Sequence, residues 1–157
     1  MPSKPKAGER YWDLISPYWL PLNESWNRGV NAFLSESRKV PGPVIHLYAG
    51  HWCQSEVNNG GLCQFFVNTT GLLAPEALQA LRTLGLLEWF AVLSEAISYF
   101  GDPYPRERAA RLKMLPEGER GHKAADPFVA LDDRFYTSRD AARDHWERTA
   151  DEYAATA

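Results

Sequence analysis

Cysteine and net charge are both scarce in this chain of 157 residues. The two cysteines, Cys53 and Cys63, are too few for a disulfide framework, and we expect both thiols to be reduced. Seventeen Lys and Arg stand against twenty Asp and Glu, so the formal charge is only −3. This balance excludes a basic protein that holds nucleic acid mainly through phosphate contacts.

Long apolar segments are missing as well. The most apolar stretch, residues 84–96, is interrupted by glycine, serine and glutamate, and it is too short to span a bilayer. No apolar run follows the two lysines of residues 1–9, so we expect no signal peptide there. We predict a cytoplasmic protein without membrane contact, with a flexible tail over residues 1–9 and one domain over residues 10–157.

Sequence patterns typical of metal and cofactor sites are also absent. His46, His51, Cys53 and Cys63 lie close together, but they form neither a C-x-x-C nor an H-E-x-x-H motif. The sequence has no phosphate-binding loop and no dinucleotide fingerprint. We expect no metal and no cofactor, and we expect both cysteines to act as small buried apolar residues.

Hydrophobic residues, in contrast, recur at helical spacing along almost the whole chain. This pattern predicts an all-α fold, with a single compact domain of about seven or eight helices joined by short loops. Proline at the first turn and glycine at the C-terminal cap mark several boundaries. The expected helices run from Pro43 to near Glu56, from Gly61 to Gly71, from Pro75 to Gly85, over 87–100 as the central buried helix, over 106–115 as a charged surface helix, and through Ala142, Trp146, Ala150 and Tyr153 as the last helix.

Four aromatic residues near the N-terminus recur at every seventh position: Trp12, Trp19, Trp26 and Phe33. The spacing is that of a heptad, but Pro17 and Pro21 fall inside it and would break a continuous helix. We therefore interpret these side chains as anchors of an N-terminal segment that wraps around the core, with a new helix beginning near Asn23.

The segment over residues 55–71 concentrates glycine and polar side chains. Gly60 and Gly61 allow a sharp corner between two helices. The polar residues around this corner are Glu56, Asn58, Asn59, Gln64 and Asn68. One interpretation is a pocket for a small ligand or a partner's backbone, and another is a buried polar lock whose amides satisfy free N–H and C=O groups at helix ends. An enzyme that uses Glu56 as a general base is a further alternative.

Two stretches of the chain also carry a family resemblance. They are Glu56-Val57-Asn58-Asn59-Gly60-Gly61 with the following Gln64-Phe65-Phe66, Asn68 and Gly71, and the later Leu131-Asp132-Asp133-Arg134-Phe135-Tyr136. Over roughly residues 40–155 the chain resembles a bacterial family of unknown general function whose best-known member is a DNA-mimic protein. The resemblance implies an all-α fold and a dimer, with carboxylates spaced like DNA phosphates that face a helix-turn-helix regulator.

Two groups of acidic residues are candidates for contact with a partner. Four carboxylates are spaced to line one face of the last helix: Asp140, Asp144, Glu147 and Asp151. They either face a basic, DNA-reading surface or pair with Arg143 and Arg148 on their own helix. Asp132 and Asp133 are either an acidic contact point, or one caps a neighbouring helix while the other pairs with an arginine.

These observations favour a non-catalytic module that binds a protein partner. The partner is a helix-turn-helix regulator or another DNA-binding protein, and the module does not bind nucleic acid itself. An immunity or antitoxin-like inhibitor of one toxin is the alternative from the same class. A small hydrolase built on the polar residues around Glu56 is the alternative from a different class. Aromatic residues near the N-terminus are candidates for a homodimer contact.

Overall fold

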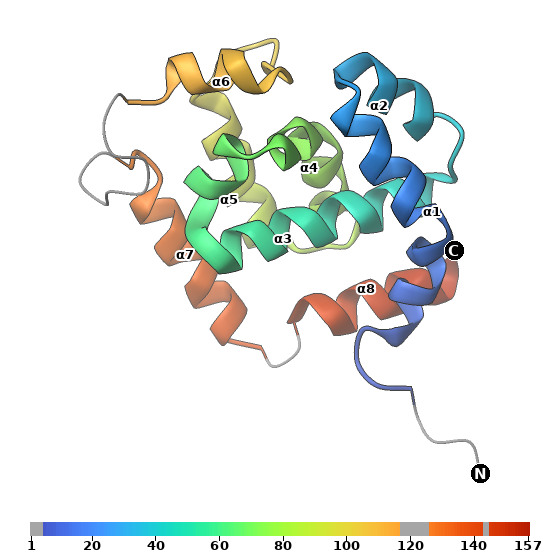
Figure 1. The fold of residues 1–157 in the computed structure, drawn as a ribbon. Helices are drawn as coiled ribbons and strands as arrows, with labels where there is room; N and C mark the ends of the chain where they lie inside the picture. Colours follow the sequence, from blue (N-terminus) through green and yellow to red (C-terminus); the bar gives the residue numbers. More distant parts are fainter. Residues whose placement is uncertain (1–4, 117–125, 143–144) are drawn as a thin grey trace.

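The computed structural model describes residues 5–116, 126–142 and 145–157, and the regular structure of these residues is entirely helical. The prediction of an all-α fold with seven or eight helices is confirmed (Figure 1). None of the described helices is both long enough and apolar enough to cross a membrane. The elements are α1 (Glu9–Asn27), α2 (Val30–Ser37), α3 (Gly42–Val67), the 3-10 helix η1 (Thr69–Leu73), α4 (Ala74–Thr83), α5 (Leu87–Ser98), α6 (Arg108–Met114), α7 (Val129–Asp140) and α8 (His145–Thr156).

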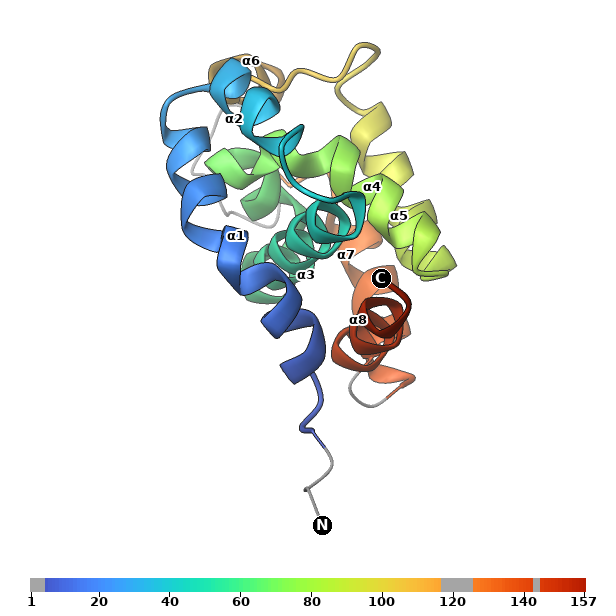
Figure 2. The same ribbon diagram turned by 90° about the vertical axis from the view of Figure 1, so that its right-hand side faces the viewer.

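Helix α3 is the centre of the fold. Figure 2, viewed along α3, places α1 on one side of it and α4 and α5 on the other. The helix predicted over residues 87–100 as the central helix corresponds to α5. Helix α5 buries only one face, through Trp89 and Val92. Its other side carries Leu87, which is 66% exposed, and Tyr99, which is 42% exposed. The prediction of its central position is wrong, because an apolar composition does not reveal that α3 is covered on more sides.

Helix α1 runs without interruption through both of its prolines, so the prediction of a break there is wrong. Pro17 and Pro21 lie on the exposed side, where carbonyl groups that lose a helical donor can be hydrated. The tryptophans lie on the side that faces α3, and the ring of Trp19 stacks on Trp52 with centroids 5.2 Å apart. Packing of the aromatic side chains therefore stabilises a helix that local propensity disfavours.

The glycine corner, which we define as Gly60 and Gly61, divides α3 into two parts. Gly61 has φ 80° and ψ 177°, and Gly60 has φ −155° and ψ 18°. The predicted corner is confirmed, although the first part continues beyond Glu56 up to the glycines. The second part ends at Val67, and Gly71, the predicted end of this helix, lies in η1.

The C-terminal region contains two helices where the sequence predicts one. Between α7 and α8 the chain turns, and α8 lies against the beginning of α1 and against α3 (Figure 1). Trp146 packs directly on Gly50, where an added Cβ would lie 2.4 Å from the indole ring. Asp151 accepts hydrogen bonds from the backbone N–H groups of Gly8 (2.8 Å) and Tyr11 (2.9 Å), and so caps α1.

Helix α6 is not purely a surface helix, because Arg111 within it is fully buried. Its guanidinium donates to the backbone carbonyls of Phe66 (2.9 Å) and Asn68 (2.9 Å), at the C-terminal end of α3. It also donates to the carbonyls of Pro105 (3.2 Å) and Arg106. The last carbonyls of a helix have no intrahelical donor, so a positive group in this position stabilises the end of α3.

Candidate functional site

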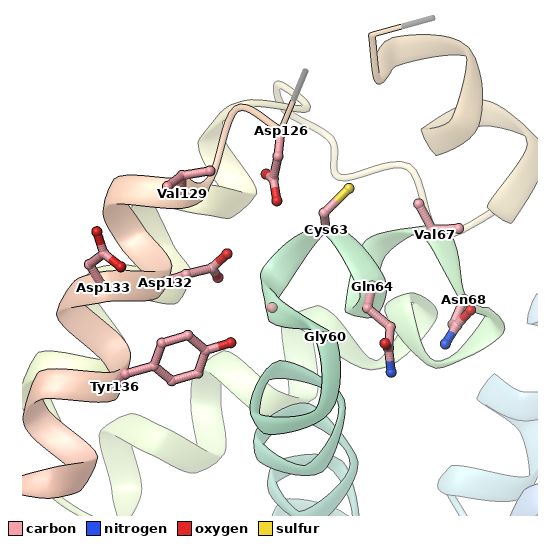
Figure 3. Close-up of a pocket in the computed structure, with 11 residues that line it drawn as sticks. Gly60, Cys63, Gln64, Val67, Asn68, Asp126, Val129, Asp132, Asp133 and Tyr136 are labelled. Atoms are coloured by element: carbon pink, nitrogen blue, oxygen red, sulfur yellow. The ribbon is translucent and has the colours of Figure 1, made fainter. Parts of the chain in front are cut away.

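A groove of about 540 Å³ lies between the glycine corner of α3 and one face of α7 (Figure 3). Both stretches that carry the family resemblance contribute to it, although they are about seventy positions apart in the sequence. Its side chains supply both polar and apolar surface. The residues that line the groove are Gly60, Gly61, Cys63, Gln64, Val67, Asn68, Asp126, Val129, Asp132, Asp133 and Tyr136.

Glu56 lies behind the groove and organises two of its lining residues. Its carboxylate accepts hydrogen bonds from Gln64 Nε2 (2.7 Å), Asn68 Nδ2 (3.1 Å) and Thr70 Oγ1 (2.8 Å). Glu56 is buried in the first part of α3, whereas all three donors follow the glycine corner, in the second part of α3, at its C-cap and in η1. These contacts form a buried polar lock between the two parts of α3, but the amides bind the Glu56 carboxylate and not, as predicted, free backbone groups at helix ends.

Asn58 and Asn59, which the sequence groups with this lock, lie outside it. Both are exposed, and Asn58 donates to Gln54 Oε1 (2.9 Å) and accepts from Arg139 (2.8 Å). Gln64 and Asn68 fit both interpretations of the polar cluster, because they belong to the lock and also line the groove. Glu56, the proposed general base of the hydrolase alternative, is not one of the groove-lining residues.

Asp132 connects α7 to the glycine corner. Its Oδ1 accepts the backbone N–H of Leu62 (2.8 Å), the first residue after Gly61, so a side chain of α7 caps the second part of α3. Burial raises the pKa of the Asp132 carboxyl to about 6, and the nearby charges of Asp126 and Asp133 act in the same direction. The hydrogen bond from Leu62 opposes this shift without cancelling it.

The groove contains residues that the sequence interpretation missed, above all Asp126 and Tyr136. Asp126 Oδ1 accepts the N–H of Phe128 (2.8 Å), and Tyr136 donates its hydroxyl hydrogen to the carbonyl of Val57 (2.6 Å). The sequence offered one signal for Asp126, since an aspartate followed by Pro127 is typical of the start of a helix. Nothing local indicated that Tyr136 would reach α3, because that contact depends on how α7 packs.

The acidic residues of the C-terminal region do not form the predicted line. Asp140 is the last residue of α7, Glu147 and Asp151 belong to α8, and Asp144 lies outside the described residues. The prediction that all four share one helical face is wrong, because α7 ends at Asp140 and α8 begins at His145. Asp140 pairs with the neighbouring Arg139 (2.8 Å).

Of the acidic pair on α7, Asp132 is 9% exposed and caps the second part of α3, whereas Asp133 is exposed. Their neighbour Arg134 pairs with Glu88 (2.9 Å) and Glu95 (3.1 Å), both on α5. This arginine therefore ties α7 to α5, and Asp133 is the member of the pair that is accessible to a partner.

The pKa of Asp132 leads to a testable dependence of stability on pH. Its value of about 6 in the folded chain exceeds the usual value of about 3.9. Between these values the folded chain binds more protons than the unfolded chain, so this group's contribution to stability falls as pH rises. We compare the unfolding free energy of the wild type with that of the Asp132→Asn variant. The difference, wild type minus variant, should fall by about 2–3 kcal/mol between pH 4 and pH 7.

Chemical denaturation at pH 4, 5, 6 and 7 measures this difference. Asparagine retains an oxygen that can accept the N–H of Leu62, so the cap is retained while the charge is removed. The comparison with a variant is required because burial also lowers the pKa of His51 to about 4. The contribution of His51 to stability therefore rises with pH over the same range, and it cancels in the comparison. Asp13→Asn, on the exposed side of α1, is the matched control. A wild-type minus Asp132→Asn difference that is constant over the range would contradict the prediction.

The fold and the groove together define a compact all-helical protein with a polar groove at a glycine corner. The family model described as DMP19-like protein matches residues 38–156, about three quarters of the chain. The chain belongs to this DMP19-like family. Comparisons with curated proteins and with solved structures find no match.

Proposed function

We propose that this protein is a non-catalytic module that binds a DNA-binding protein, such as a helix-turn-helix regulator, at the surface that otherwise contacts DNA. The observation that carries the proposal is the accessible acidic face of α7, within the region that the family model matches. Asp133 and Asp140 are both exposed, and their seven-residue separation corresponds to a rise of about 10.5 Å. The sequence resemblance to a DNA-mimic protein supports the same function.

The contacts divide the candidate acidic residues into two roles. Asp132 and Asp151 accept backbone N–H groups of their own chain and act as internal caps. Asp133 and the half-buried Glu147 remain for a partner, and Asp140 is exposed although it also pairs with Arg139. Duplex DNA carries one negative charge per about 1.7 Å of its axis, so α7 supplies far fewer charges over the same length. Shape complementarity must therefore contribute much of the affinity, and we expect a weaker dependence on salt than DNA itself shows.

A pull-down from native lysate, with and without competing duplex DNA, tests the proposal when read by mass spectrometry. We expect a DNA-binding protein that competing DNA displaces. The double variant Asp133→Asn/Asp140→Asn should lower its recovery at least tenfold, since two rim charges that steer the complex are lost. The control Asp13→Asn/Glu24→Gln removes the same charge from the exposed side of α1 and should retain the partner. A partner that DNA leaves in place would contradict the proposal and would indicate a toxin or an enzyme as the target.

A further inference from the structure

We propose that the groove between the glycine corner and α7 is a binding site for the guanidinium group of an arginine side chain. The proposed function supplies the source of that arginine, namely the DNA-reading surface of the protein partner. The chemistry of the groove itself is independent of that function and can be tested on the isolated protein.

The amide side chains that line the groove have a fixed orientation. Gln64 Nε2 and Asn68 Nδ2 both donate to the carboxylate of Glu56, at 2.7 Å and 3.1 Å. Glu56 engages the nitrogen of each amide, so the oxygen and at most one N–H of each amide remain for a ligand. The hydroxyl of Tyr136 donates its hydrogen to the carbonyl of Val57 (2.6 Å), so its oxygen is left as an acceptor. With the carboxylates of the groove added, acceptor oxygens outnumber the remaining amide donors, so the lining suits a ligand that donates hydrogen bonds.

Two carboxylates give the groove its charge. Figure 3 shows the side chains of Asp126 and Asp132 directed into the space between α7 and the glycine corner. Each accepts one backbone N–H through its Oδ1, and an ionised carboxylate has further lone pairs beyond that bond. Burial is the main cause of the raised pKa of Asp132, and the negative charge of Asp126 adds to it. A bound cation would offset that repulsion and lower this pKa.

The shape of the lining favours arginine over lysine. Tyr136 presents an aromatic ring, and Val67 and Val129 add apolar surface beside the polar groups. A guanidinium is planar, weakly hydrated and able to stack on an aromatic face, whereas an ammonium is compact and strongly hydrated. Within the chain, the guanidinium carbon of Arg139 lies 4.8 Å from the centroid of the Tyr136 ring and covers one face, so a bound guanidinium would use the other face.

NMR titration of the isotopically labelled protein at low salt tests the site. The probe is N-acetyl-arginine N-methylamide, and its comparators are the corresponding citrulline and lysine derivatives. Citrulline has nearly the shape of arginine without its charge.

We expect saturable shifts of the amide signals of Gly60, Gly61 and Leu62 with arginine, and at least tenfold weaker binding of both comparators. The pKa of Asp132, followed through its carboxyl carbon, should fall when arginine binds. Absence of saturation, or equal binding of lysine, would overturn the proposal.

A variant that preserves the fold separates the groove from the proposed function. Asp126→Asn keeps an oxygen that can accept the N–H of Phe128 and removes one charge, so we expect at least fivefold weaker arginine binding. Asp13→Asn, the control on α1, should bind as the wild type does. If arginine does not bind while a DNA-displaceable partner is still captured, the groove proposal fails and the proposed function stands. If arginine binds but DNA displaces no partner, the proposed function fails.

Discussion

Replacing Arg111 by methionine is expected to lower the free energy of unfolding by about 3–5 kcal/mol. The guanidinium is fully buried and donates to backbone carbonyls of Phe66, Asn68, Pro105 and Arg106. Methionine is flexible enough to fill much of the space, but it donates no hydrogen bond. The carbonyls would remain buried without their donor, and a lost partner costs more than the hydrogen bond itself contributes.

The expected loss can be measured by urea denaturation of the purified variant. Arg82→Met, on the exposed face of α4, is the matched control, because it makes the same substitution where the side chain meets solvent. We expect that control to change stability by less than about 0.5 kcal/mol. Equal stability of the Arg111→Met protein and the wild type would mean that the carbonyls at the end of α3 find other donors.

Arg111 also illustrates which features of the fold could be predicted from the sequence. The helical spacing of apolar residues predicted the all-α architecture, and the paired glycines predicted the corner in α3. Both signals are local, since they depend on the residues of the element itself. An arginine in a charged segment looks the same whether its side chain meets water or the end of another helix. Its burial depends on contacts with residues more than forty positions away, such as Phe66.

The candidate site was predictable to a similar extent. Sequence reasoning grouped Gln64 and Asn68 with the polar residues around the glycine corner, and it offered a helix cap as one role for Asp132 or Asp133. It did not bring these residues together, because the groove exists only when α7 packs beside the glycine corner. The prediction that the acidic residues from Asp140 onward share one helical face was wrong for the same reason. The charge periodicity continues in the sequence beyond Asp140, where α7 ends, so it does not reveal that a separate helix follows.

The glycine corner provides the second large effect, because Gly61→Ala is expected to destabilise the protein by about 2–4 kcal/mol. The combination of φ 80° and ψ 177° at Gly61 is accessible almost only to glycine, and a side chain there costs about 1–3 kcal/mol. An added Cβ would also lie 2.6 Å from Oδ2 of Asp132. The alanine therefore displaces the carboxylate that caps the second part of α3, which adds about 1 kcal/mol.

Comparison with Gly85→Ala separates these two causes. Gly85 also has a positive φ, 75°, but an added Cβ there would meet no other described atom within 4 Å. We expect this control to cost only about 1–2 kcal/mol, the conformational cost alone. If both variants lose the same stability in urea denaturation, the contact with Asp132 contributes nothing. A larger loss for Gly61→Ala, together with weaker arginine binding in the groove, would show that the corner and the α7 carboxylate form one unit.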